Sequence, residues 1–371
     1  MVILIYIIVS KSGFNFSLLL SFSFSFSFLK EPCLPIIKSQ FKPRNFIFRN
    51  SHASTIYASL LRAWMPRVKF ERERLELSDG DFIDLDWSKK SNRITQKNEI
   101  KKLIITVAGL EGKSNSLYSR AAIRFFNKKG WDAIGMNYRG CSGEPNRLLR
   151  GYHMGASDDL KATVEHAIRT HGYNEIVLLG YSLGGNLALK YIGEEGEGLA
   201  KEVVSCVTFS VPKDIQKSDE RLNKWYNWHY LKWFMLPLNI KANRKKKRYP
   251  EALKSYKGFF MSGNFVYFDT HFTAPANGFK TVQDYWKASS CDPVLKNITI
   301  PTLVVSSLND TFISENCYPI AAAKQNLNLY LEMPKYGGHC GYIRNAIEKS
   351  WWMEERALDF VEENFKSVCE S

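Results

Sequence analysis

The chain has 371 residues, 45% of them hydrophobic and 14% aromatic, which is enough for one large α/β domain with an insertion or for two smaller domains. Its formal net charge of +14 suits a polyanion or an anionic lipid surface if the charge is concentrated in one place. The seven cysteines form neither a CxxC pair nor a metal-ligand spacing, which argues against a cysteine metal site and favours reduced thiols in a non-oxidising compartment. We therefore expect a cytoplasmic protein, with association with a membrane left open.

Residues 1–33 are apolar and rich in Ser and Phe, and Lys11 is the only charged residue before Lys30. Three interpretations compete, which are a membrane anchor, a signal or transit peptide, and an extension outside the folded domain. The uncharged run around Phe14 to Leu29 is short for a membrane span of about 20 residues, and no small-residue cleavage site is clear. We favour an extension outside the fold.

The first folded segment begins with a hairpin pattern. Alternating apolar residues flank Asp79-Gly80 in "RERLELSDGDFIDLDW", which predicts two strands joined by a tight turn. A strand follows over Leu103 to Val107, and strands then alternate with helical patterns. Because these strands are close to continuously apolar, we expect an α/β fold with a mostly parallel, doubly wound sheet, helices on both faces and an N-terminal hairpin.

The alternation stops over residues 212–288 and resumes afterwards. This segment is rich in aromatic residues and carries 15 Lys and Arg against 6 Asp and Glu, centred on "KANRKKKR". We therefore predict a first core part over residues 34–211, a helical lid insertion over residues 212–288, and a second core part over residues 289–371. The basic run fits either a solvated helix face or a contact with a membrane surface, and we expect no nucleic-acid partner.

A strand-like run "EIVLL" leads directly into "GYSLGGN". The first five residues of that stretch fit G-x-S-x-G, in which a sharp strand-to-helix turn lifts a serine hydroxyl, here that of Ser182, out of the sheet. A serine needs a base, and the base needs an orienting carboxylate. Asp310 ends the predicted strand "TLVVSSLND", and His339 lies in "KYGGHCG" after the last predicted strand. The order Ser, Asp, His and the three positions past strand ends predict a charge-relay triad.

The oxyanion of a tetrahedral intermediate needs hydrogen-bond donors that are already in place. The N–H of Leu183, which follows the nucleophile, is one candidate. The N–H of Leu110, in "VAGLEG" at the end of an earlier strand, is the other.

Each of these residues also has a plainer interpretation. Taken alone, an aspartate placed like Asp310 is more often a turn-forming residue, and a histidine placed like His339 is more often packed in a loop. Their joint order and placement favour the triad. Cys340 lacks an elbow of its own and is a poor nucleophile candidate, while His153 in "GYHMG" fits either the wall of the site or a structural role.

Taken together, these stretches resemble the YheT-type branch of the α/β-hydrolase superfamily. The resemblance rests on "FRNSHASTIY", "DGDFIDLDW", "GLEGKSNS", "NYRGCSGEPNRLLRGYHMG", "GYSLGGN", "PTLVVSSLNDTF" and "KYGGHCGY", and covers roughly residues 35–365. It implies the α/β-hydrolase fold, a triad of Ser182, Asp310 and His339, and carboxylesterase or monoacylglycerol-lipase-like activity. The chain departs from the family at Ser51-His52, where Gly-His is usual, and at Asp310-Thr311, where Asp-Pro is common.

Three functions are weighed on these grounds. The first is a serine hydrolase that cleaves short- to medium-chain acyl esters or monoacylglycerol-like lipids through an acyl-enzyme on Ser182, without metal or organic cofactor. The second is an acyltransferase that uses the same triad. The third is a non-catalytic protein that binds anions or a membrane surface through the basic insertion.

Overall fold

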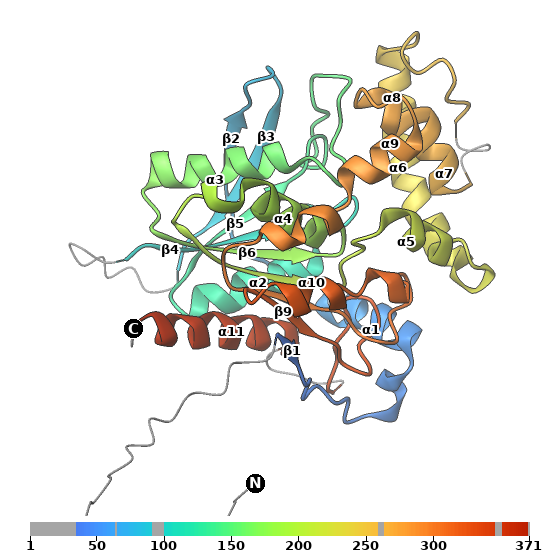
Figure 1. Cartoon of the computed structure of the whole chain (residues 1–371). Coiled ribbons are helices and arrows are strands. Elements are labelled where there is room, and N and C mark those ends of the chain that lie inside the picture. Colours follow the sequence, from blue (N-terminus) through green and yellow to red (C-terminus); the bar gives the residue numbers. More distant parts are fainter. Residues whose placement is uncertain (1–34, 64, 91–99, 259–262, 346–350, 370–371) are drawn as a thin grey trace, which may run out of the picture. The chain divides into compact units, whose positions relative to one another are not determined.

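The computed structural model describes residues 35–63, 65–90, 100–258, 263–345 and 351–369, so the predicted extension over residues 1–33 lies outside the described residues. The described chain is built on a nine-stranded sheet in the order β1-β9-β8-β7-β6-β4-β5-β3-β2 (Figure 1). The strands are β1 Ile36–Ile37, β2 Glu71–Glu76, β3 Phe82–Ser88, β4 Lys102–Val107, β5 Asp132–Asn137, β6 Glu175–Tyr181, β7 Val203–Phe209, β8 Thr302–Val305 and β9 Leu329–Glu332.

The sheet is antiparallel at one edge and parallel elsewhere. β2 and β3 form the predicted hairpin around Asp79-Gly80, and β3 also runs antiparallel to β5. All the other neighbouring strands pair in parallel, including the short β1, which pairs with β9. The prediction of a mostly parallel sheet with an N-terminal hairpin is confirmed.

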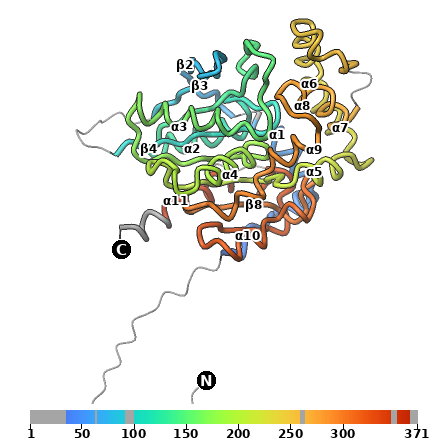
Figure 2. The backbone as a smooth tube through the Cα atoms, turned by 45° about the horizontal axis from the view of Figure 1, so that its top comes forward, coloured from blue at the N-terminus to red at the C-terminus, as the bar shows by residue number. Residues whose placement is uncertain are grey.

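Helices cover both faces of the sheet (Figures 1 and 2). Leu103 and Ile105 of β4 pack in one hydrophobic core with α3 and α4, whereas Ile104 packs on the opposite face in a core with α2 and α11. This alternation follows from the two-residue period of a strand, and it confirms the doubly wound arrangement. The helices are α1 Ser51–Ala63, α2 Leu117–Lys128, α3 Ser157–His171, α4 Leu183–Glu195, α5 Ile215–Leu222, α6 Trp228–Arg248, α7 Phe265–Phe268, α8 Ala274–Ala276, α9 Val282–Ser289, α10 Ile320–Gln325 and α11 Trp352–Cys369.

The segment predicted as an insertion, residues 212–288 and called the insertion below, holds α5 to α8 and all of α9 but its last residue, and it lies between β7 and β8 in the chain. Its side chains form two small cores of their own, one centred on Tyr285 and Trp286 and the other on Met235 and Tyr256. Figure 2 shows these helices gathered at one end of the sheet. No helix in the described part of the chain is both long and apolar enough to cross a membrane.

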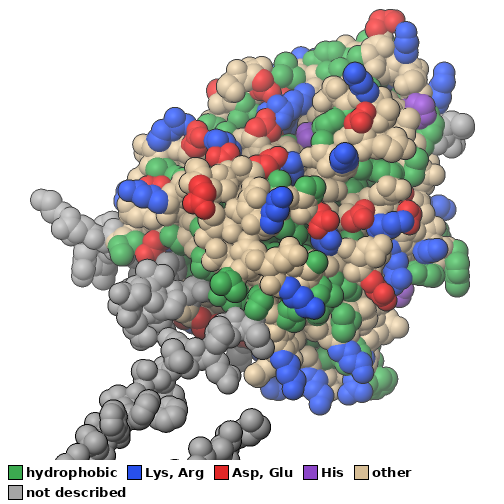
Figure 3. Space-filling model, in the orientation of Figure 1, with side chains coloured by type: hydrophobic (Ala, Val, Ile, Leu, Met, Phe, Trp, Pro, Cys, Tyr) green, Lys and Arg blue, Asp and Glu red, His purple; other side chains and the backbone are tan. Residues whose placement is uncertain are grey.

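Three of the basic side chains in "KANRKKKR" are used inside the protein. Lys241 pairs with Glu111, Lys245 donates to the carbonyl oxygens of residues 148–150, and Lys246 donates to the carbonyl of Tyr256. Over most of the face in Figure 3, basic and acidic side chains are interspersed. The basic stretch "KANRKKKR" therefore both links the insertion to the core and contributes positive charge to the surface.

Candidate active site

The turn between β6 and α4 holds Ser182 in a conformation that non-glycine residues rarely adopt, with φ +53° and ψ −120°. A Cβ at Gly184 would collide with the carbonyl oxygens of Val107 and Ala108, and one at Gly180 would lie 2.6 Å from the Cα of Gly185. The glycines of the motif are thus required by the close approach of neighbouring backbone. They let the strand turn sharply enough to present the serine side chain at the rim of the sheet.

The structure brings the three predicted polar side chains together at this rim. The Oγ of Ser182 lies 2.9 Å from Nε2 of His339. The Nδ1 of His339 lies 3.0 and 3.1 Å from the two carboxylate oxygens of Asp310. The Ser182 hydroxyl, the imidazole and the carboxylate therefore form one hydrogen-bonded chain, although Ser182 and Asp310 are far apart in the sequence.

The carboxylate of Asp310 is buried and fixed by its own backbone surroundings. The residue is 1% exposed, and its Oδ1 accepts hydrogen bonds from the N–H groups of Phe312 at 2.8 Å and Ile313 at 3.2 Å. Asn309 serves the neighbouring loop instead, because its Oδ1 accepts from the N–H of Gly338. The two adjacent residues thus have separate tasks, and only Asp310 faces the imidazole.

The loop that carries His339 is held by α1, an element that the sequence patterns did not predict. The N–H of His339 donates to Oγ1 of Thr55 at 2.9 Å. A Cβ at Gly338 would collide with the carbonyl oxygen of Ser51, also in α1. On its other side the imidazole packs against Phe312, with ring centroids 4.3 Å apart. The stretch "FRNSHASTIY" was a signal for this region only through its resemblance to relatives.

The two predicted oxyanion donors come from the turns that follow β6 and β4. Leu183 is the first residue of α4, so its N–H has no acceptor within the helix. Leu110 lies in the turn after β4, and both residues line the same cavity as Ser182 and His339.

The turn that carries Leu110 is clamped from two sides, which sequence reasoning missed. Glu111 has φ +57°, and its N–H donates to the Tyr152 hydroxyl at 2.9 Å. That hydroxyl donates back to Oε1 of Glu111 at 2.7 Å, and Nζ of Lys241 lies 2.7 Å from Oε2. Lys241 is in α6, so the insertion directly restrains the residue next to Leu110. "GLEG" and "KANRKKKR" carried the two partners, but nothing in the sequence paired them.

The Ser182 side chain opens into a cavity of about 720 Å³ between the sheet rim and the insertion. The large apolar side chains of the insertion fall into an exposed group and a group that lines the cavity. Trp225, Trp228 and Trp233 are 83%, 57% and 78% exposed. The apolar wall of the cavity is instead formed by Ile215, Leu222, Phe234, Leu238, Phe265, Phe268, Phe272 and Trp286.

His153 and Cys340, the two other residues considered for the site, both have side chains that their surroundings keep uncharged. His153 lines the cavity, where its Nδ1 accepts from the N–H of Gly155, and burial lowers the pKa of His153 to about 4. It is therefore uncharged at neutral pH. The Cys340 thiol is buried, and burial raises its pKa to about 12, so it lacks the thiolate that a cysteine nucleophile requires.

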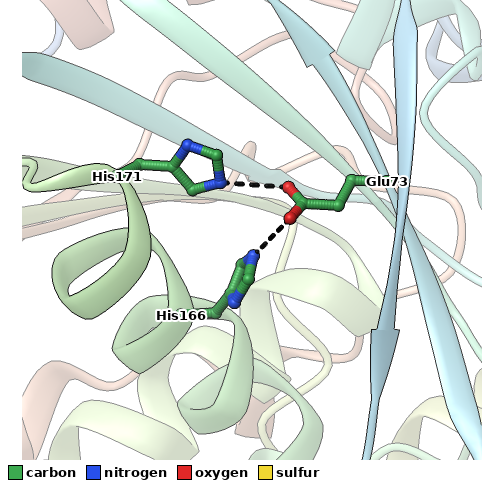
Figure 4. Close-up of side chains that lie close together, drawn as sticks. All are labelled: Glu73, His166 and His171. Atoms are coloured by element: carbon green, nitrogen blue, oxygen red, sulfur yellow. Dashed lines mark hydrogen bonds and ion pairs between the residues drawn. The ribbon is translucent and has the colours of Figure 1, made fainter.

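One group of His, Cys, Asp and Glu side chains among the described residues has the spacing of metal ligands. Figure 4 shows it, with Glu73 on β2 facing His166 and His171 on α3. One donor atom from each residue lies within 4.8 Å of the others. None of the three lines the cavity at Ser182.

Comparison with known proteins agrees with this architecture. The family described as alpha/beta hydrolase fold matches residues 102–346. YheT of Escherichia coli (strain K12), which is named as a candidate esterase, is 31% identical over 85% of this chain and 91% of its own. Human phospholipase ABHD3 is 27% identical over 91% of this chain and 81% of its own. An esterase from Pyrococcus furiosus shares the fold with a TM-score of 0.51 and 16% identity, over 80% of this chain and 91% of that chain.

Proposed function

Because the chain belongs to the α/β-hydrolase fold family, we propose that it is a serine hydrolase that cleaves carboxylic esters. The observation that carries the proposal is the continuous contact from Ser182 through His339 to Asp310, with separations of 2.9 and 3.0 Å. The names of two relatives, a candidate esterase and a phospholipase, are in keeping with it.

In the proposed reaction, Oγ of Ser182 attacks the ester carbonyl carbon while Nε2 of His339 takes the hydroxyl proton. The tetrahedral intermediate collapses, the bond to the alcohol oxygen breaks, and His339 gives its proton to the leaving alcohol. A water molecule then attacks the acyl-enzyme, loses a proton to His339, and releases the carboxylic acid as the proton returns to Ser182. Asp310 orients the imidazole and stabilises its charged form.

We assign stabilisation of the oxyanion to the N–H groups of Leu183 and Leu110. The N–H of Leu183 lies at the N-terminus of α4, so the positive end of the helix dipole would also stabilise the oxyanion there. The clamp on Glu111 by Tyr152 and Lys241 fixes the backbone next to Leu110 before substrate arrives, as preorganised stabilisation requires.

The acyl group is proposed to lie against the apolar wall that the insertion contributes. The cavity volume of about 720 Å³ falls in the usual range for small ligands. Short- to medium-chain acyl esters and monoacylglycerol-like lipids are the substrates that this wall suits.

The first test is labelling with a fluorophosphonate probe, which reacts only with an activated serine. Wild-type protein should label, Ser182→Ala should not, and Ser59→Ala, which alters an exposed serine of α1, should label like wild type. Labelling that survives in Ser182→Ala would contradict the proposal. Product analysis with and without added alcohols then separates hydrolysis from acyl transfer, because both use the same groups.

A contact with membranes is also proposed, through the outer face of the insertion. Trp233, Leu236 and Ile240 follow one face of α6 and are 78%, 53% and 46% exposed. Indole rings favour the interface between water and lipid. Lys232, which precedes Trp233 in α6 and lies over the ring of Trp228, suits an anionic bilayer. The aromatic face supports this proposal more directly than the basic run, which is partly used inside the protein.

A further inference from the structure

We propose that Glu73, His166 and His171 form a binding site for a divalent transition metal ion, with Zn²⁺ as the expected occupant. Two imidazole nitrogens and a carboxylate oxygen are a donor set that zinc accepts, with water in the fourth position. The site would join the edge strand β2 to α3. It is separate from the Ser182 cavity and independent of the proposed hydrolysis.

The three donors already converge (Figure 4). Nε2 of His166 lies 2.9 Å from Oε1 of Glu73, and Nε2 of His171 lies 3.0 Å from Oε2. Ligand atoms at about 2.0–2.1 Å from a tetrahedral zinc ion stand roughly 3.3 Å apart. The two imidazoles face different oxygens of the Glu73 carboxylate, and the three donor atoms lie within 4.8 Å of one another. Small side-chain rotations, on the order of 1 Å, would bring them to the spacing of zinc ligands.

Neighbouring side chains hold the proposed ligands in place. The indole N–H of Trp87 donates to Oε2 of Glu73 at 2.7 Å. The ring of Trp87 also packs on His171, with centroids 4.3 Å apart. Nδ1 of His166 lies 3.2 Å from the hydroxyl of Thr170, so it can donate its proton there while Nε2 binds the ion. Supporting hydrogen bonds of this kind orient ligands in metal sites.

Access and fold placement also suit an ion. The side chains of Glu73, His166 and His171 are 32%, 16% and 30% exposed, which leaves an open side for water and for entry. β2 is the terminal strand of the sheet and is paired only with β3 within the described chain. A metal bridge from β2 to α3 would tie down this edge.

The same contacts also fit a metal-free hydrogen-bond network in which both Nε2 atoms carry protons. Glutamine separates the two possibilities, because its amide can still donate to Glu73 but is not a zinc ligand of the imidazole type. His171→Gln is therefore the diagnostic variant. His271→Gln, a change to a histidine of the insertion outside the cluster, is the matched control.

The experiment is a calorimetric titration of Zn²⁺ into the full-length protein after treatment with a chelator, combined with thermal unfolding with and without Zn²⁺. We expect saturable binding of one ion per chain and a higher Tm with zinc, because an ion that binds the folded state stabilises it. His171→Gln should weaken binding ~10-fold or more and abolish the shift in Tm, while His271→Gln should change neither. The proposal would be overturned if the wild-type protein did not bind one Zn²⁺ per chain, or if wild type and His171→Gln bound Zn²⁺ equally well. The first of these outcomes does not depend on any variant folding correctly.

Discussion

The sheet and the insertion both bury aspartates, but they differ in what those aspartates contact. Asp84 and Asp86 of β3 are buried in the sheet, and each accepts two hydrogen bonds from an arginine of β2. Asp219 and Asp269 are buried in the insertion. Neither of these two has an ion-pair partner among the described residues. Burial alone would raise the pKa of Asp84 and Asp86, but hydrogen bonds, those from the arginines foremost, together with the arginine charges outweigh it and lower the pKa. In the insertion, hydrogen bonds from neutral groups offset burial only in part, and burial raises the pKa of Asp219 to about 6 and that of Asp269 to about 7.

The two regions thus treat buried acids in opposite ways. In the sheet, each of these buried carboxylates is held by hydrogen bonds from a positively charged side chain. Asp310 is likewise held, by His339 and by two backbone N–H groups. Asp219 and Asp269 line the cavity but form no ion pair with another described residue, so burial favours their neutral forms. This contrast accords with the proposed function, in which the sheet rim supplies fixed charges for the reaction and the insertion supplies the apolar wall of the cavity.

The largest expected effect comes from removing the fixed charge at the rim. Asp310→Asn should lower kcat for a p-nitrophenyl ester by ~10⁴-fold, because an amide cannot hold the imidazole in its required tautomer. Asp292→Asn, which alters an exposed carboxylate paired with Lys213, is the matched control. A loss of less than about tenfold would show that Asp310 is not the orienting acid.

For the buried acids of the insertion, the free energy of unfolding should depend on pH with the opposite sign to that of an acid held by a cation. The pKa of Asp269 is about 7 in the folded protein against 3.8 in its ordinary state. A raised folded pKa gives stability that is complete below the unfolded pKa and is lost as pH rises through the folded one.

Asp269→Asn should therefore gain stability relative to wild type between about pH 4 and 7. The difference in the free energy of unfolding should grow by up to ~1.4 kcal/mol per pH unit. Urea unfolding at several pH values measures it, with Glu251→Gln, an exposed acid of the insertion, as control. A difference that stays constant with pH would remove the contrast between the two regions.

The contact between the two regions is tested at Lys241. Lys241→Met should remove one of the two restraints on Glu111 and lower kcat ~10- to 100-fold with little change in KM, because a displaced oxyanion donor affects the transition state more than the bound substrate. Lys241→Arg should restore most of the activity, since it keeps a cation for Glu111. Lys247→Met, an exposed change further along α6, controls for general damage to the helix. A rise in KM with kcat unchanged would instead assign Lys241 to substrate binding.

The sequence predicted what local patterns encode and missed what depends on distant contacts. The elbow around Ser182 has a fixed chemical pattern, and Asp310 and His339 each follow a recognisable strand, so topology alone places them together. β1 is two residues long, too short for any periodicity, and its place comes from β9 at the other end of the chain. The pairing of Glu111 with Lys241 likewise joins two regions 130 positions apart. No local signal links the members of such a pair.

The smallest expected effect concerns the outer face of the insertion, where apolar groups meet water rather than the cavity. The double change Trp228→Ser and Trp233→Ser removes two exposed indoles, so binding to anionic liposomes in a sedimentation assay should fall several-fold. Activity on a water-soluble ester should stay as in wild type, because neither side chain lines the cavity. Raising the salt concentration should weaken the remaining binding, since salt screens the charge of the nearby Lys232. Liposome binding that survives both the tryptophan changes and high salt would place the membrane contact elsewhere on the protein.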